Sequence, residues 1–440
     1  MSRRKSRRAI REPIEITIDG LSHEGRGVGR IDGKAVFVHG ALPGERVLAR
    51  IQRSRATFDE ADTVSVLEAS PQRIEPRCPH FGVCGGCSLQ HMSEEHQLAH
   101  KQSVMLELLQ HQAGLQPQHL AEPIHGPQWG YRRKARLGVK HVAAKGGVIV
   151  GFRERAKPYV TNSEQCDVLD ARVGQHLPAL RALIQGTSVA DKIPQIEVAI
   201  GDDCVALVIR HMESLSESDE IAFRQFAELA QVDIYSQSGG LDTVRPLNSE
   251  AAPLSYTIDG LNLRFEPVDF VQVNAAINAD MIARAIDYLQ LTTADAIADL
   301  FCGLGNFSLP LARRAGHLLG IEGDAGLIER AGANARANGI ENCEFRSANL
   351  ADPATITALD LGGANKLLLD PPRTGALELI EGLDLRAISR LVYVSCNPVT
   401  FARDAALLCD RHGFALLECG VLDMFPQTAH VESISLFAKP

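Results

Sequence analysis

The sequence predicts a multidomain α/β protein with an N-terminal OB-like β-barrel, a strand-rich central domain and a C-terminal, Rossmann-like, doubly wound sheet. Residues 13–68 contain short alternating apolar and polar runs broken by Gly, Asp and Pro, which is typical of a small barrel. From residue 271 apolar strands alternate with helical stretches, which predicts βαβ crossovers in a mainly parallel sheet. The expected parts are a basic tail, the barrel, the central domain and the sheet domain, at 1–12, 13–72, 73–270 and 271–440.

The composition indicates an ordinary globular protein. The 440 residues are 45% hydrophobic and 22% charged. No apolar run approaches the roughly 20 residues that span a bilayer, and the first residues lack the apolar stretch of a secretory signal, so we expect a cytoplasmic protein without membrane contact. Ten cysteines in that compartment should not form disulfides.

Positive charge is concentrated in two segments of an otherwise acidic chain. The net charge is −9, yet residues 1–55 hold 13 Lys and Arg against 6 Asp and Glu. Residues 131–157 hold nine basic residues against Glu154 alone. Local basic surface is what the neutralisation of nucleic-acid phosphates requires, although the first segment alone could be a solvated tail.

The barrel and the second basic segment suggest where RNA would bind. The segment 13–72 resembles the TRAM domain, an RNA-binding barrel of RNA-modifying enzymes, although a purely structural barrel is the alternative. The candidate phosphate contacts in the central domain are Arg132, Arg133, Lys134 and Arg136. Side chains alternate along a strand, so not all four can meet one RNA strand. A helix near 95–113 is expected to pack on the C-terminal domain.

A glycine turn follows the first strand of the C-terminal domain. A dinucleotide fingerprint would need a third glycine where the chain has Ser308, so NAD is disfavoured. S-adenosylmethionine has no pyrophosphate and needs close backbone approach, which Gly303 and Gly305 permit. Glu322 ends the next strand and suits the ribose hydroxyls. Asp370 ends a later strand in "LLLDPPRTGA", as in methyltransferases that hold a flat base beside a methyl donor.

Four motifs occur in order within residues 271–440: "DLFCGLGNFSLPLA", "DPPRTGA", "VYVSCNPVTFARD" and "DMFPQTAHVE". On these motifs the chain resembles the RNA uracil-C5 methyltransferases. The resemblance implies a domain that binds S-adenosylmethionine and assigns donor-binding roles to Gln272, Phe301, Asn306, Glu322, Asn349 and Asp370.

The chemistry explains why a cysteine and a second acid would be needed. Cys396 lies where an apolar run ends before Asn397-Pro398, so its thiol could be either core packing or a reachable nucleophile. Carbon 5 of uracil is a poor nucleophile, and a thiolate that adds to carbon 6 supplies the missing electron density. A general base must then remove the proton on carbon 5. The resemblance assigns Cys396 as the nucleophile and Glu432 as the base.

Three cysteines are closely spaced in "CPHFGVCGGCSLQH". Cys78, Cys84 and Cys87 predict a metal or cluster site, and zinc with a nearby histidine is one reading of the spacing. The chain also resembles the 23S ribosomal RNA branch of the family, which implies a [4Fe-4S] cluster with Cys166 as fourth ligand. Cys204, Cys302, Cys343, Cys409 and Cys419 lack such grouping, and we expect them to pack in cores.

The barrel and the cysteines favour 23S ribosomal RNA as the substrate. Transfer RNA enzymes of the family look shorter and lack both features, although another ribosomal uridine or a transfer RNA remains an alternative. We expect a monomer that does not act on DNA, since DNA cytosine-C5 enzymes carry a Pro-Cys loop and this chain has Ser395 before Cys396. A rival from another class is a non-catalytic RNA-binding protein that retains the fold.

Overall fold

The computed structural model describes residues 12–248 and 251–439, so residues 1–11 of the expected basic tail lie outside the described residues. The described chain divides into two compact units. The first takes the described part of residues 1–101 with 153–161 and 425–430, and the second takes 102–152, 162–424 and 431–440. The boundaries expected from the sequence, 13–72, 73–270 and 271–440, remain a prediction.

The first unit begins with a small, strongly curved β-sheet. Alternating apolar residues of its strands, such as Val36, Val38 and Val47, form a fully buried core. Gly29 lies so close to the first strand that a Cβ atom would come 2.3 Å from the carbonyl oxygen of Thr17, so the sheet curls back on itself. The strand order is β1-β5-β6-β4-β3-β2. The strands are β1 (Ile14–Thr17), β2 (Gly20–Leu21), β3 (Gly27–Ile31), β4 (Lys34–His39), β5 (Arg46–Ser54) and β6 (Phe58–Glu68).

A helix follows the cysteine-rich segment, as the sequence predicts. It is α1 (Glu94–Leu108), which ends in a π-helical turn, Leu109–Ala113, closed by Gly114 in the left-handed conformation. Val104, Met105 and Leu109 belong to the apolar core under the large sheet of the second unit. The second half of the helix is therefore part of that core.

The central residues of the second unit form a six-stranded sheet covered by helices. The sheet has the order β13-β12-β11-β10-β8-β9 and is antiparallel except between β11 and β12. Leu180, Phe223 and Ile196 pack in its fully buried core. The elements are β8 (Lys134–Val142), β9 (Gly147–Gly151), β10 (Gln195–Ile200), β11 (Val205–Arg210), β12 (Asp233–Gln237), β13 (Val244–Pro246), α2 (Ala171–Gly174), α3 (Leu177–Gln185) and α4 (Glu217–Ala230), with 3-10 turns at Ala143–Lys145 and Leu241–Thr243.

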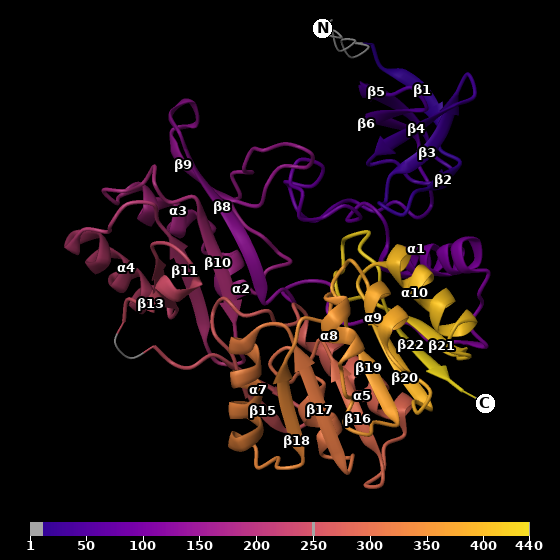
Figure 1. Ribbon diagram of the computed structural model, residues 1–440. Coiled ribbons are helices and arrows are strands. Elements are labelled where there is room, and N and C mark those ends of the chain that lie inside the picture. The colour runs from indigo at the N-terminus through magenta and orange to yellow at the C-terminus, as the bar shows by residue number, and fades with distance from the viewer. Residues whose placement is uncertain (1–11, 249–250, 440) are drawn as a thin grey trace, which may run out of the picture. The chain divides into compact units, whose positions relative to one another are not determined.

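The C-terminal part of the second unit is an eight-stranded sheet with the order β18-β17-β16-β19-β20-β22-β21-β7. The first five strands in that order are parallel, as the alternation of strands and helices predicts, and they appear side by side in Figure 1. The last two long strands form the expected closing hairpin, but β22 inserts between β20 and β21. The strands are β7 (His119–Leu120), β16 (Ala296–Leu300), β17 (His317–Glu322), β18 (Cys343–Ser347), β19 (Lys366–Leu369), β20 (Arg390–Ser395), β21 (Ala415–Leu422) and β22 (Glu432–Ala438).

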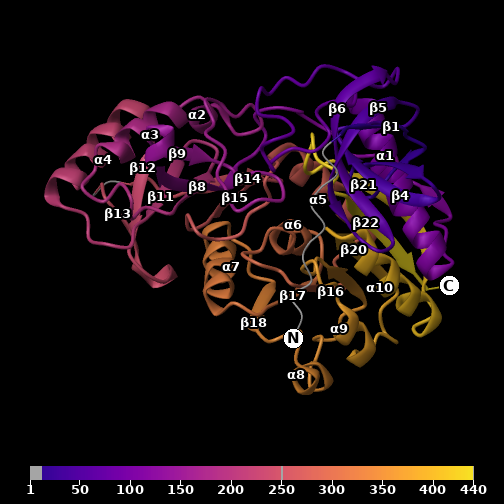
Figure 2. The same cartoon turned by 90° about the horizontal axis from the view of Figure 1, so that it is seen from above.

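Helices cover both faces of this sheet (Figure 2). One face carries α5 (Ala275–Leu289), α6 (Ser308–Ala312) and α7 (Ala325–Ala337), and the other carries α8 (Pro353–Thr357), α9 (Leu377–Gly382) and α10 (Pro398–Asp410). A short hairpin, β14 (Ser255–Ile258) with β15 (Leu261–Arg264), precedes them. Among the described residues no helix is both long and apolar enough to cross a membrane.

Candidate active site

The candidate residues gather at the carboxyl edge of the parallel strands. Ligands of doubly wound sheets bind at this edge, where the strand order reverses. Here the reversal lies between β16, which continues to β17, and β19, which continues to β20. Because the strands are parallel, the turn after β16, Glu322 at the end of β17, Asp370 after β19 and Cys396 after β20 all lie at the same edge.

The turn after β16 has an unusual backbone. Phe301 has φ of 68°, a left-handed conformation that costs a non-glycine residue about 1–3 kcal/mol. Hydrogen bonds from the backbone N–H groups of Phe301 and Cys302 to the carbonyl oxygen of Ile321, at 2.9 and 3.1 Å, hold it there. Gly303, at φ of 56°, has no atom within 4 Å of the place where a Cβ would lie. The turn therefore offers bare backbone and open space to a ligand.

Glu322 is fixed against this turn. Its carboxylate accepts hydrogen bonds from the backbone N–H of Gly303 at 3.3 Å, of Gly323 at 2.6 Å and of Asp324 at 3.1 Å. A carboxylate has about four acceptor positions, so capacity remains for a hydroxyl group of a ligand. The position fits the ribose contact expected from the sequence.

Two carboxyl groups near the turn are poorly hydrated. Burial raises the pKa of Asp370 to about 7. Burial also raises the pKa of Asp299, in the middle of β16, to about 7, and the nearby charges of Asp370 and Glu322 act in the same direction. Asp299 is fully buried and accepts a hydrogen bond from the hydroxyl of Ser308. Sequence reasoning missed Asp299, although a lone acid inside the apolar run "AIADLF" is a visible signal.

The other expected donor-binding residues occupy different surroundings. Asn306 exchanges two 2.9 Å hydrogen bonds with the amide of Asn278, and its Oδ1 also accepts one from the hydroxyl of Tyr256 at 2.9 Å. Three of its four hydrogen-bonding positions are thus used within the protein. Asn349 lies in an exposed loop after β18 and accepts a hydrogen bond from the N–H of Ala351 at 3.0 Å.

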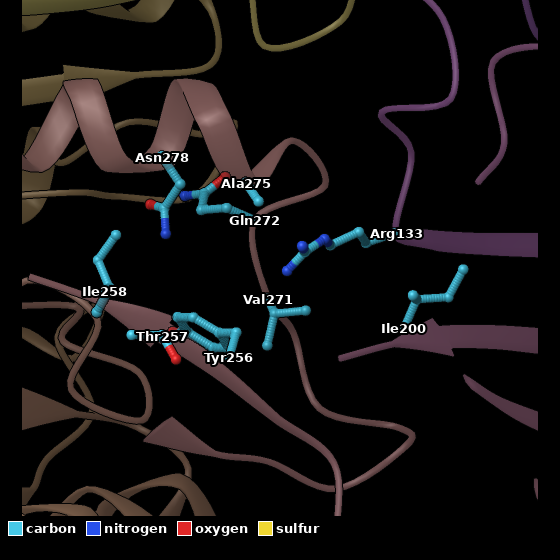
Figure 3. Close-up of a pocket in the computed structure, with 9 residues that line it drawn as sticks. All are labelled: Arg133, Ile200, Tyr256, Thr257, Ile258, Val271, Gln272, Ala275 and Asn278. Atoms are coloured by element: carbon cyan, nitrogen blue, oxygen red, sulfur yellow. The ribbon is translucent and has the colours of Figure 1, made fainter. Parts of the chain in front are cut away.

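Gln272 lines a small pocket of about 20 Å³. Figure 3 shows Gln272 and Asn278 on one side of this space, Tyr256 on the other, and the Arg133 side chain directed toward it. Its lining residues are Arg133, Ile200, Tyr256, Thr257, Ile258, Val271, Gln272, Ala275 and Asn278. The lining thus comes from the residue before β8, the end of β10, strand β14 and the segment that leads into α5.

Cys396 lies opposite Glu432 at the ends of two neighbouring antiparallel strands. The register pairs Ser395 with Ser433, so the next residue of β20 and the preceding residue of β22 face one another. Glu432 is 7% exposed, whereas Cys396 is partly exposed. The structure thus brings the two residues together although they are 36 positions apart in the chain.

The surroundings of Cys396 favour the protonated thiol. Burial first, and then the charges of Glu432 and Asp370, raise the pKa of the thiol to about 11, while Arg373 acts in the opposite direction. Cys396, Glu432 and Asp370, all predicted from the sequence, are therefore close enough for their charges to interact. Arg373 was not predicted as a site residue, although it lies in the motif "DPPRTGA".

The four basic candidates in the central domain have contacts within the protein. Arg136 is 70% exposed on its side chain and pairs with Glu197 at 2.6 Å, while Arg133 pairs with Asp202 at 2.7 Å. The Lys134 ammonium donates to the carbonyl oxygen of Pro267 at 2.6 Å, and burial lowers its pKa to about 8. The Arg132 guanidinium lies over the ring of Phe152. Lys134 thus supports the loop that leads to Gln272.

Three of the four expected cluster ligands lie in one loop of the first unit. The N–H of Gly86 points to Sγ of Cys84 at 3.4 Å, and Cys84 and Cys78 are close enough to influence each other's charge. Cys87 follows in the same loop, and Cys166 belongs to the second unit. Among the described residues no group of three or more His, Cys, Asp or Glu side chains has a geometry that could hold a metal ion.

Comparisons with known proteins agree with this arrangement. A model of the tRNA (uracil-5-)-methyltransferase family matches residues 93–439, and the TRAM domain matches residues 7–64. The chain belongs to the uracil-C5 methyltransferase family. Both the TRAM domain and the methyltransferase fold expected from the sequence are confirmed.

Relatives at high identity place the chain within a branch of the uracil-C5 methyltransferase family. It is 49% identical to a protein of Alkalilimnicola ehrlichii named 23S rRNA (uracil(1939)-C(5))-methyltransferase RlmD, over 99% of both chains. Proteins of the same name from Xanthomonas campestris and Stenotrophomonas maltophilia are each 47% identical, over 99% and 100% of both chains. A crystal structure of Pyrococcus abyssi tRNA (uracil-54, C5)-methyltransferase in complex with S-adenosyl-L-homocysteine shares the fold, with a TM-score of 0.76, 22% identity and coverage of 96% of this chain and 99% of that one.

Proposed function

We propose that the protein transfers a methyl group from S-adenosylmethionine to carbon 5 of a uridine in 23S ribosomal RNA, with uridine 1939 of its relatives' names as the target. The observation that carries this proposal is the pairing of Cys396 with Glu432 beside Asp370, at the sheet edge that also holds the glycine turn. A nucleophile, a base and a site for a nucleoside meet there.

The residues of the edge suit a bound methyl donor. S-adenosylmethionine, when bound, supplies an electrophilic methyl group. Glu322 would accept hydrogen bonds from its ribose, and the open backbone at Gly303 would allow its close approach. Phe301, Asn306 and Asn349 flank the same edge, and Gln272 and Asp370 would bind toward the reacting end. Asn306 could contribute one further hydrogen bond, because its other positions are occupied.

Cys396 and Glu432 would carry the reaction on uracil. The Cys396 thiolate forms a bond to carbon 6, and the electron pair of the 5,6 double bond moves toward carbon 5 and the adjacent carbonyl. Carbon 5 then takes the methyl group of the donor as the bond between that methyl and the donor's sulfur breaks, which would leave neutral S-adenosylhomocysteine. Glu432 removes the proton from carbon 5, the electron pair restores the double bond, and the bond between sulfur and carbon 6 breaks. Arg373 stabilises the thiolate that must form first.

Trapping with RNA that contains 5-fluorouridine tests the chemistry directly. Fluorine cannot leave as a proton, so we expect a covalent complex that survives denaturation. Cys396→Ala should abolish both the complex and methyl transfer, whereas Cys409→Ala, in the same domain, should retain them. Glu432→Gln should accumulate the adduct on natural RNA. Full methyl transfer by Cys396→Ala would refute the mechanism and would favour the non-catalytic RNA-binding alternative.

We further propose a [4Fe-4S] cluster held by Cys78, Cys84, Cys87 and Cys166. The support is the spacing of three thiols in one loop and the N–H of Gly86 directed at Cys84 Sγ, a contact that favours a thiolate. Four protein thiolates leave no open iron, so the cluster would hold the fold or position RNA. Anaerobically purified protein should contain iron and sulfide, which Cys84→Ser should lose and Cys204→Ser retain. Zinc in place of iron would overturn the proposal.

The RNA-binding surface, the oligomeric state and the cellular compartment are also part of the proposal. We propose that the TRAM domain and exposed basic residues such as Arg136 contact RNA, and that the protein acts as a cytoplasmic monomer on RNA and not on DNA. Loss of 5-methyluridine from 23S ribosomal RNA in cells that lack the protein would support this substrate. Loss from transfer RNA alone would favour the transfer RNA alternative.

A further inference from the structure

Asp404 connects three segments that surround the candidate nucleophile. It lies in α10, is 0% exposed, and its Oδ2 accepts hydrogen bonds from the hydroxyl of Tyr393 at 2.6 Å and from the backbone N–H of Ala376 at 2.7 Å. Its Oδ1 accepts from Nε of Arg403 at 2.8 Å. Tyr393 belongs to β20, which leads into Cys396, and Ala376 ends the loop that begins at Asp370.

Side chains of α10 and of its N-cap also hydrogen-bond to backbone carbonyl groups of the loop between Asp370 and Ala376. Nη2 of Arg403 donates to the carbonyl oxygen of Thr374 at 2.9 Å. The carbonyl oxygen of Arg373 accepts from Nδ2 of Asn397 at 3.0 Å and from the hydroxyl of Thr400 at 3.2 Å. Backbone groups of three loop residues, Arg373, Thr374 and Ala376, are therefore tied to α10 or to its N-cap, Asn397, which directly follows Cys396.

The loop fits against Asp404 without spare room. Gly375 has φ of 76°, and a Cβ on it would lie 2.5 Å from Oδ2 of Asp404 and 2.5 Å from Nη2 of Arg403. At such distances the Asp404 and Arg403 side chains, the loop or the helix would have to move. The carboxylate and the loop backbone are thus in direct contact.

We infer that Asp404 is a positioning residue that fixes the segment from Asp370 to Arg373 relative to the Cys396 thiol. The inference rests on the proposed function, in which Cys396 is the nucleophile. The charged groups that act on the thiol are Glu432 from β22, Asp370 after β19 and Arg373 from the loop. Cys396 in turn influences the hydroxyl of Tyr393 on the preceding strand. Arg373 is the group that favours the thiolate, so its distance from the sulfur determines how readily the adduct forms.

Loss of the Asp404 contacts would let the loop move and would weaken the effect of Arg373. The thiolate would then form at higher pH. We expect Asp404→Asn to shift the pH profile of adduct formation with 5-fluorouridine RNA to higher pH by about one unit and to slow the reaction about threefold near pH 7. The affinity for S-adenosylhomocysteine should change by less than twofold.

A matched control separates this role from stability. Asp219 in α4 is 3% exposed and also accepts four hydrogen bonds, from Ser188 and Ser216. Asp219→Asn should lower the melting temperature and leave the pH profile unchanged. A wild-type profile in folded Asp404→Asn would overturn the inference.

If Asp404→Asn does not fold, Arg403→Lys decides the question, because it keeps the charge and cannot make both contacts. An unchanged profile in that variant would also refute the positioning role. Failure of the wild-type protein to form any adduct would instead refute the proposed function.

Discussion

The reactivity of Cys396 in the RNA-free protein is the sharpest test of the site. With a pKa of about 11, about one thiol in ten thousand is ionised at pH 7, against about three in a hundred for an ordinary cysteine. Alkylation of Cys396 by iodoacetamide should therefore be slow and should rise about tenfold per pH unit up to at least pH 9, because the thiolate is the reacting species.

Glu432→Gln removes the acid whose charge opposes ionisation of the Cys396 thiol most strongly. A neighbouring charge shifts a pKa by about one to three units, so a fall of about one unit is the smallest expected change. It would give about tenfold more thiolate at pH 8. Nucleophilicity falls with pKa, with a Brønsted coefficient of about 0.45, so the net alkylation rate should rise about threefold.

Peptide-resolved mass spectrometry measures each cysteine separately and provides a control within the same molecule. Cys409 also has a pKa raised by burial to about 11, with Asp410 as its charged neighbour. Its alkylation rate should be equal in the wild-type protein and in Glu432→Gln. A plateau of Cys396 alkylation near pH 8 in the wild-type protein, or equal rates in the two proteins, would refute the electrostatic account.

Two further predictions concern stability. Gly375→Ala should lower the free energy of unfolding by well over the roughly 1 kcal/mol expected for a left-handed residue, because its Cβ would meet Asp404. Gly413→Ala, at φ of 71° with open space around the Cβ position, should lose only about that smaller amount. Urea unfolding measures both. Equal losses would mean that the loop is not pinned. The raised pKa of Asp299 means that its stabilising contribution is complete below about pH 4 and is lost as pH rises through about 7, by up to about 4 kcal/mol. Asp299→Asn should therefore raise the melting temperature at pH 8. Asp295 is the matched control. Burial would raise its pKa, but hydrogen bonds from Asn365 and Thr292 hold the pKa below its usual value. The ionised form of Asp295 is therefore stabilising, and Asp295→Asn should lower the melting temperature at pH 8. A lower melting temperature of Asp299→Asn at pH 8 would contradict the sign.

The parallel strands and the positions of Cys396 and Asp370 could be predicted because local patterns determine them. Each parallel strand is a short apolar run followed by a turn, and the residue at its end must lie at the binding edge. Cys396 and Asp370 follow from that rule. Glu432 required the family motif, because nothing in the local pattern indicates that β22 inserts beside β20.

The partners of these residues could not be predicted from the sequence. Asp404, Asn278 and Tyr256 act through hydrogen bonds to segments that are distant in the chain, such as the 50 positions between Tyr256 and Asn306. The number of basic residues in a segment also does not show which of them face solvent and which bind other parts of the protein. Lys134 belongs to the basic segment, yet its ammonium is bound to the carbonyl of Pro267, because the fold brings that loop against β8.

The insertion of β22 between β20 and β21 affects how the protein can be made. The strand that carries Glu432 is the last of the sheet to be synthesised, yet both of its neighbours depend on it for their backbone hydrogen bonds. While the ribosome is still adding residues 423–431, β20 has an apolar edge with no partner. A nascent chain stalled at that point has Cys396, the proposed nucleophile, but not Glu432, the proposed base, and it presents an unpaired strand edge that is prone to aggregation.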